Sequence, residues 1–215
     1  MIAIVRAATI CTALALPIGA FAQDQAADAE TDTDTQTESA NQPATSGLSM
    51  GTVEGEAGEP KVGQTYVAQE ISDWELRCVK TETGKDPCQL YQLLKDSQGN
   101  PVAEFSIFNL SDGGEAAAGA TIVTPLETLL TAQLRMAVDA SETRRYPYSF
   151  CSQIGCIARV GIPQGEVDAF KRGNAATITI VPVAAPNQNV GLKMSLAGFT
   201  AGWNALVEAN TPEVE

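Results

Sequence analysis

The chain has no histidine among its 215 residues. Histidine is the commonest general base and the commonest metal ligand in proteins, so its absence removes every Ser-His and Cys-His dyad. The sequence also lacks a Ser-x-x-Lys motif and the lysine of a P-loop. We therefore predict no catalytic residue, no cofactor site and no metal site, and we expect a protein that is not an enzyme.

Basic residues are scarce, with 13 Lys and Arg against 26 Asp and Glu and a net charge of −13. Residues 23–60 carry nine of the acids and no base. Because an acidic surface repels a phosphate backbone, nucleic acid is not an expected partner. The same segment has almost no large apolar side chains, so residues 23–60 are predicted to form a disordered acidic linker.

Only the first 22 residues contain a long apolar run. Arg6 precedes a mostly apolar stretch over residues 7–20, and Ala20-Phe21-Ala22 forms a small-x-small cleavage site. This pattern predicts a signal peptide over residues 1–22. The run is shorter than the roughly 20 residues that span a membrane. We therefore expect no membrane span and a location in the periplasm, in the medium or at the cell surface.

Five cysteines are present, and Cys11 falls within the predicted signal peptide, which leaves four. Four cysteines in an exported chain predict two disulfides, for which three connectivities are possible. Short polar segments separate Cys78 from Cys88 and Cys151 from Cys156, so local pairing across two turns is the simplest arrangement. Neither spacing matches a redox-active Cys-x-x-Cys pair, so we interpret these disulfides as structural.

Residues 61–215 have the pattern of short strands separated by turns. Trp74, Leu76 and Cys78 alternate with polar residues, which is the period of a half-buried strand. The pattern predicts one all-β domain, an antiparallel jelly-roll-like β-sandwich with one or two short helices. A first helix is expected from Pro163 to Gly173, and a second over residues 201–208 with Thr200 as its cap. Further strands are expected over residues 88–93, 102–110, 120–124, 130–138, 146–151, 156–161, 176–183 and 190–196.

A group of basic and aromatic residues is the candidate ligand contact. It consists of Arg144, Arg145, Tyr146 and Tyr148 and could meet an acidic or sugar ligand, although a solvated turn with two edge tyrosines is the simpler interpretation. Trp74 and Trp203 lie on apolar faces, so core packing is the better interpretation than sugar stacking. A carboxylate pair for glycoside hydrolysis would have to come from acids in or near the expected strands, namely Glu75, Glu104, Glu127 and Asp139.

Four short motifs, in this order, resemble the invasion-associated locus B family. They are Trp74-Glu75-Leu76-Arg77-Cys78, Cys88-Gln89-Leu90-Tyr91-Gln92, Tyr148-Ser149-Phe150-Cys151 with Gly155-Cys156-Ile157-Ala158, and Ser195-Leu196-Ala197-Gly198-Phe199. The resemblance covers about residues 66–207. It implies an exported alphaproteobacterial protein with a compact β-sandwich, from a family first associated with the entry of a pathogen into host red cells.

Three functions follow from these features. The first is a non-enzymatic envelope or surface protein that binds a protein or glycan at the cell envelope or host surface, in host-cell interaction or in envelope maintenance. The second is a carboxylate-dependent hydrolase acting on envelope polysaccharide. The third is a chaperone-like stress protein of the periplasm that receives an extended chain at an open sheet edge.

Overall fold

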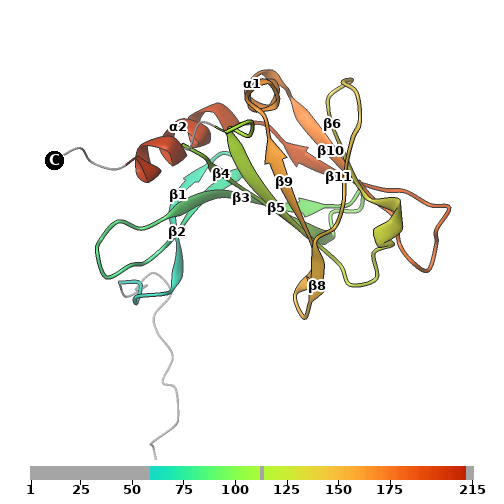
Figure 1. Ribbon diagram of the computed structural model, residues 1–215, viewed down its shortest axis with the longest axis horizontal. Helices are drawn as coiled ribbons and strands as arrows, with labels where there is room; N and C mark the ends of the chain where they lie inside the picture. The colour runs from blue at the N-terminus through green and yellow to red at the C-terminus, as the bar shows by residue number, and fades with distance from the viewer. Residues whose placement is uncertain (1–58, 112–113, 212–215) are drawn as a thin grey trace, which may run out of the picture. The chain divides into compact units, whose positions relative to one another are not determined.

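The chain folds into eleven strands, two α-helices and one 3-10 helix over residues 59–111 and 114–211, the part that this computed structural model describes (Figure 1). The predicted signal peptide and nearly all of the predicted linker lie outside these residues. The strands are β1 (Thr65–Ile71), β2 (Trp74–Val79), β3 (Cys88–Lys95), β4 (Pro101–Asn109), β5 (Ala118–Thr124), β6 (Leu134–Val138), β7 (Arg144–Tyr146), β8 (Phe150–Ser152), β9 (Gly155–Ile162), β10 (Ala175–Ile180) and β11 (Val190–Ser195). The helices are η1 (Leu130–Ala132), α1 (Gln164–Arg172) and α2 (Phe199–Asn210).

The strands form one antiparallel sheet in the order β7-β6-β10-β11-β3-β4-β5-β9-β8, with the β1–β2 hairpin joined to β3. The sheet curls, and the chain that leaves β7 returns to β9, where the Ser149 N–H donates to the Ile157 carbonyl oxygen. The predicted antiparallel all-β fold with two short helices is therefore confirmed. The two halves of one curled sheet supply the two layers of the sandwich.

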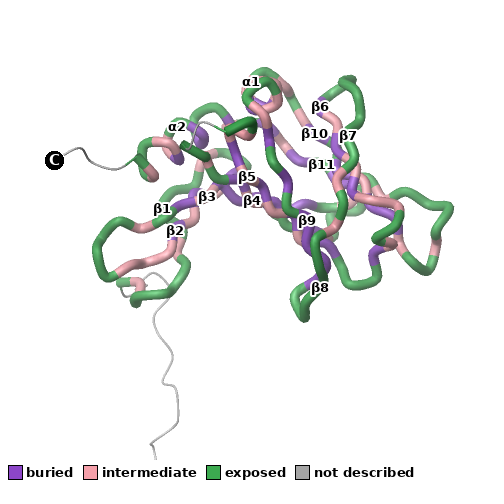
Figure 2. Tube along the Cα trace, in the orientation of Figure 1, coloured by how far each residue is buried: buried purple, intermediate pink, exposed green. Residues whose placement is uncertain are grey.

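The concave side of the sheet holds the core, because one face of each strand is apolar. In β2 the alternate residues Trp74, Leu76 and Cys78 are buried, as their spacing predicts. Both helices lie over this side (Figure 1) and pack apolar side chains against the same cluster. A series of close aromatic contacts runs through the core, and its rings belong to Trp74, Phe105, Phe170, Phe199 and Trp203. Both tryptophans are core residues, as expected, and the buried segments follow the strands in Figure 2.

Three local expectations are wrong. The segment predicted as one strand over residues 130–138 begins as η1, and the strand starts only after Gln133, which has a φ of +58°. The strand expected over residues 146–151 is divided at Pro147, which has no N–H to donate to a ladder. Helix α2 begins at Phe199 after Gly198, and the Thr200 hydroxyl donates to the Lys171 carbonyl oxygen of α1 instead of capping α2.

Strand β3 is held on one edge by two different partners. Its first half pairs with β2, while its last residue, Lys95, pairs with Lys193 of β11. Between them the buried side chain of Gln92 reaches Ser195 of β11, donating to its carbonyl oxygen at 3.0 Å and accepting from its N–H at 2.7 Å. The Gln92 carboxamide thus hydrogen-bonds as a peptide group would and connects the two halves of the sheet.

Both disulfides lie between neighbouring strands and follow the local pairing. Cys78 of β2 is bonded to Cys88 of β3, and Cys151 of β8 to Cys156 of β9, each pair directly opposite in the strand register. Each therefore closes a hairpin, one around the 80–87 loop and the other around the 153–154 turn.

Candidate binding surface

The structure separates the predicted ligand contacts. Arg144 and Tyr146 project to the core side of β7, where the Tyr146 hydroxyl donates to the Glu166 carboxylate at 3.1 Å and Arg144 Nε lies 3.7 Å from it. Burial and the charge of Glu166 raise the pKa of Tyr146 well above its ordinary value. Arg145, between them in sequence, is exposed and lies opposite Arg135 of β6. Arg145 is separated from Arg144 and Tyr146 because adjacent side chains of a strand point to opposite faces.

Tyr148 lies apart from this ion pair. It is half-buried, with its hydroxyl 3.4 Å from the Thr124 hydroxyl, and burial raises its pKa. The proposed role of the two tyrosines in ligand contact stays a prediction. Since both hydroxyls already have protein partners, the geometry supports a structural role in the 144–150 segment.

Three parts of the fold hold the four acids considered for hydrolysis. The Asp139 carboxylate accepts from the backbone N–H groups of Asn174 and Ala175 at 3.1 Å, which joins the ends of β6 and β10. Glu127 is exposed in the turn after β5, whereas Glu75 and Glu104 are on the outer face of β2 and β4. Among residues 59–111 and 114–211 no group of three or more Asp, Glu or Cys is arranged to hold a metal ion.

The convex, outer face of the sheet carries a row of apolar side chains across neighbouring strands. Cross-strand register aligns Leu93 of β3, Glu104 of β4, Val123 of β5, Ile157 of β9 and Phe150 of β8. Leu93 is 41% exposed and Phe150 is 45% exposed, although strand residues at solvent-facing positions are usually polar. The row is apolar except at Glu104, and exposed apolar side chains gathered on one face are typical of an interaction site.

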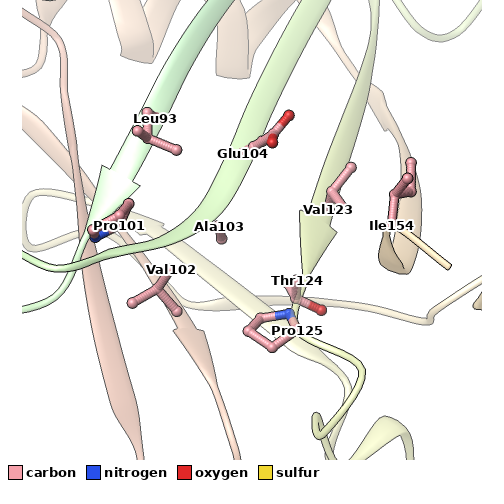
Figure 3. Close-up of a pocket in the computed structure, with 9 residues that line it drawn as sticks. All are labelled: Leu93, Pro101, Val102, Ala103, Glu104, Val123, Thr124, Pro125 and Ile154. Carbon is pink, nitrogen blue, oxygen red and sulfur yellow. The ribbon is translucent and has the colours of Figure 1, made fainter.

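A hollow of about 230 Å³ follows this row at the ends of β4 and β5 (Figure 3). Ile154 at its rim is 75% exposed, the highest value among the large apolar side chains of the described part. Figure 3 shows Leu93, Glu104 and Val123 on three successive strands, with Ile154 beyond them. We call Leu93, Val102, Val123, Phe150 and Ile154 the apolar patch.

The β8–β9 turn holds Ile154 in place through a close backbone approach. Gly155 has a φ of +138°, and a Cβ there would lie 2.3 Å from the Thr124 carbonyl oxygen at the end of β5. Only glycine fits this conformation and this distance. The adjacent Cys151–Cys156 disulfide closes the same turn. The apolar tip of the patch is therefore carried on a rigid hairpin.

Beside the patch, the outer face carries a stacked arginine. The Arg77 guanidinium lies 3.2 Å from the centre of the Tyr91 ring and donates to Glu75 at 2.7 Å. The arginine covers Tyr91, which is only 6% exposed despite its outward position. Burial raises the pKa of Tyr91, and the charge of Glu104 acts in the same direction. An aromatic residue and a bound arginine thus border the apolar patch.

One pattern in the sequence points to this surface. Once Ala103, Phe105 and Ile107 are assigned to the buried face of β4, Phe108 stands at a solvent-facing position, where it is 37% exposed. Large apolar residues at outward positions of a strand are the pattern to be noticed. The alignment of Leu93 with Val123, across Glu104 of β4, depends on register, which a single sequence does not contain.

Comparison with known proteins identifies relatives over the same region. The family model for invasion associated locus B protein matches residues 74–207. Invasion protein B homologs of Brucella abortus strain 2308 and of its biovar 1 strain 9-941 are each 26% identical over 159 residues, which covers 74% of this chain and 86% of theirs. The crystal structure of invasion associated protein B from Bartonella henselae is 20% identical with a TM-score of 0.55, over 65% of this chain and 95% of that one. That likeness supports the fold. In the part of the chain with described structure, no helix is long and apolar enough to cross a membrane.

Proposed function

The chain belongs to the invasion associated locus B family, and from this we propose that it is a non-catalytic binding protein that engages a protein partner through the apolar patch. The observation that carries the proposal is the row on the convex face in which exposed Leu93 and Phe150 align with half-buried Val123, extended by exposed Ile154. Apolar centres bordered by aromatic and arginine side chains are typical of protein interfaces.

We further propose that the protein is exported and works in the envelope or at the cell surface. The signal-peptide pattern of residues 1–22 and the two disulfides support export, because disulfides persist in oxidising compartments. The relatives are named invasion proteins, and none of the names describes an enzyme. A role in host-cell interaction or in envelope maintenance is therefore part of the proposal.

The other two functions have weaker support. The hydrolase would need two facing carboxylates, but Asp139 is occupied by backbone N–H groups and Glu127 projects from a turn. Glu75 shares the outer face with Glu104, but it is already ion-paired with Arg77. The chaperone-like function would use the edge of β1, which pairs only with β2 among the described strands. A register shift between Val67 and Gln69 interrupts this edge, and such bulges discourage strand addition.

The test is partner capture by crosslinking in living cells of the native organism. We expect the wild-type chain and a Val62→Glu variant to capture the same partner, because Val62 is 60% exposed and lies outside the patch. A Leu93→Glu/Ile154→Glu variant should lose at least about 90% of the capture, since a charge would be buried in an apolar interface.

Circular dichroism and thermal unfolding of the purified variants provide the control, because all three positions are exposed and should tolerate glutamate. Equal capture by the patch variant and the Val62→Glu variant would show that the partner binds elsewhere. Turnover of an envelope polysaccharide by the purified wild-type protein would instead favour the hydrolase.

A further inference from the structure

The other half of the outer face has an unusual distribution of charge. Strands β6, β7, β10 and β11 contain no aspartate or glutamate, although the chain has 26 acids and 13 bases. Four bases project outward there or at the adjoining end of β3. We call Arg135, Arg145, Lys193 and Lys95 the basic face.

The four bases form two directly opposed pairs. Arg135 of β6 is the cross-strand partner of Arg145 of β7, and Lys193 of β11 is the partner of Lys95 of β3. Like charges at directly opposite positions destabilise an antiparallel pair. Folding alone therefore gives no reason to place scarce bases in this arrangement.

No member of the basic face forms an ion pair within the described residues, whereas Arg77, Lys80 and Arg144 each have a carboxylate partner. The Arg135 guanidinium donates through Nη2 to the side-chain amide oxygen of Asn189, while its Nε is buried and has no hydrogen-bond partner. A buried donor without an acceptor is costly to leave unpaired. The basic face is thus both uncompensated and partly preorganised.

The surface between the bases is open and hydroxyl-bearing. Register places Thr179 and Gly191 in one row with the arginine pair, and Thr177 in the next row with the lysine pair. From β7 to β3 there are four strand steps of about 4.8 Å, so the face extends over about 19 Å. A single small anion would contact one pair, whereas an extended polyanion can reach both.

We propose that the basic face binds an anionic polysaccharide, with sulfate or carboxylate groups on the bases and sugar hydroxyls on the two threonines. Strands β6, β10 and β11 contain no aromatic residue on which nucleic-acid bases could stack. The outward residues of these strands also include no large apolar side chain that would enter a lipid layer. The chemistry of the face therefore fits a charged glycan better than nucleic acid or membrane.

This site goes beyond the proposed function and lies next to its surface, because Lys95 follows Leu93 by two residues on the same face of β3. The two proposals remain separable. The patch variant Leu93→Glu/Ile154→Glu tests the protein partner, while neutral substitutions of the bases test glycan binding.

The experiment measures binding of the purified full chain to heparin oligosaccharide, which carries sulfate and carboxylate, and to polygalacturonate oligosaccharide, which carries carboxylate alone. The variants Arg135→Gln/Arg145→Gln and Lys95→Gln/Lys193→Gln are compared with Lys61→Gln/Lys85→Gln, which changes net charge equally at exposed positions elsewhere. Each test variant should weaken binding by roughly tenfold, because two ion pairs are lost. The control should bind as the wild type does.

The result that supports the proposal is a polyanion affinity that falls with salt, falls in both test variants and is retained in the control. Binding of heparin alone assigns sulfate as the recognised group. Binding of both polyanions assigns carboxylate. The proposal is overturned if neither polyanion binds, if the control loses affinity equally, or if single-stranded DNA or anionic vesicles bind more tightly than either glycan. Uncharged dextran should not bind.

Discussion

Substitution of Gly155 by alanine is the most direct probe of how the patch is built. Gly155 has a φ of +138°, and its missing Cβ would lie 2.3 Å from the Thr124 carbonyl oxygen. The conformation alone costs about 1–3 kcal/mol for a residue with a side chain. Separating the new methyl group from the carbonyl would require a movement of about 1 Å, with an overpacking cost of about 1–3 kcal/mol. We expect a loss of about 3 kcal/mol in the free energy of unfolding.

That loss corresponds to a decrease in Tm of about 6–12 °C for a domain of this size. Thermal unfolding followed by circular dichroism, without reductant so that the disulfides stay intact, measures it. Because Ile154 precedes Gly155, the variant should also capture less of the partner than the wild type at a temperature where both are folded.

Two other glycines provide matched controls. Gly84 has a φ of +76° with nothing within 4 Å of a Cβ, so Gly84→Ala should cost only the conformational term of about 1 kcal/mol. Gly165 in α1 also has open space and no positive φ, so Gly165→Ala should stabilise the protein by about 0.5 kcal/mol. If Gly155→Ala lowers the stability no more than Gly84→Ala does, the close approach to Thr124 is not the reason for a glycine there.

Two further predictions concern the hydrogen-bonded side chains of Asp86 and Gln92. The Asp86 carboxylate accepts hydrogen bonds from the Thr81 N–H and the Tyr66 hydroxyl, which lower its pKa from 3.8 to about 2. Its contribution to stability is complete above the ordinary pKa and is lost as the pH falls towards 2. Urea unfolding between pH 2 and 5 should show this loss of stability in the wild type and a smaller loss in Asp86→Asn. If the free energy of unfolding falls equally with pH in both proteins, Asp86 is not the group responsible. For Gln92→Leu, which leaves the N–H and carbonyl of Ser195 unpaired, we expect a loss of about 3 kcal/mol in urea unfolding. Gln92→Glu, which places a carboxylate oxygen against the Ser195 carbonyl oxygen at a buried position, should lose at least as much at neutral pH. Wild-type stability of the leucine variant would rule out the bridging role.

Much of the local structure could be predicted because it depends on neighbouring residues. The alternation of Trp74, Leu76 and Cys78 specifies which face of β2 is buried, whatever strand lies beside it. The short polar segments between paired cysteines favour hairpins, and Gly173 ends α1 as the sequence predicts. Strand β1 escaped prediction because most of it is exposed and lacks such alternation.

The candidate surfaces could not be predicted in the same way. Arg144 and Arg145 are adjacent in sequence, yet one joins Glu166 at the core side and the other lies opposite Arg135 on the outer face. The strand period separates such neighbours by itself, but which partner each one meets depends on the register of distant strands.

Periods of a few residues specify the alternation of buried and exposed positions and the two helices, and short loops favour the local cysteine pairs, so these features could be inferred from the chain alone. The alignment of Leu93 with Val123 and Phe150, and that of Lys95 with Lys193, appears only in the folded sheet. Those alignments join segments that are tens of residues apart. Their register follows from the packing of the whole curled sheet around its aromatic core, a collective property that no single segment contains.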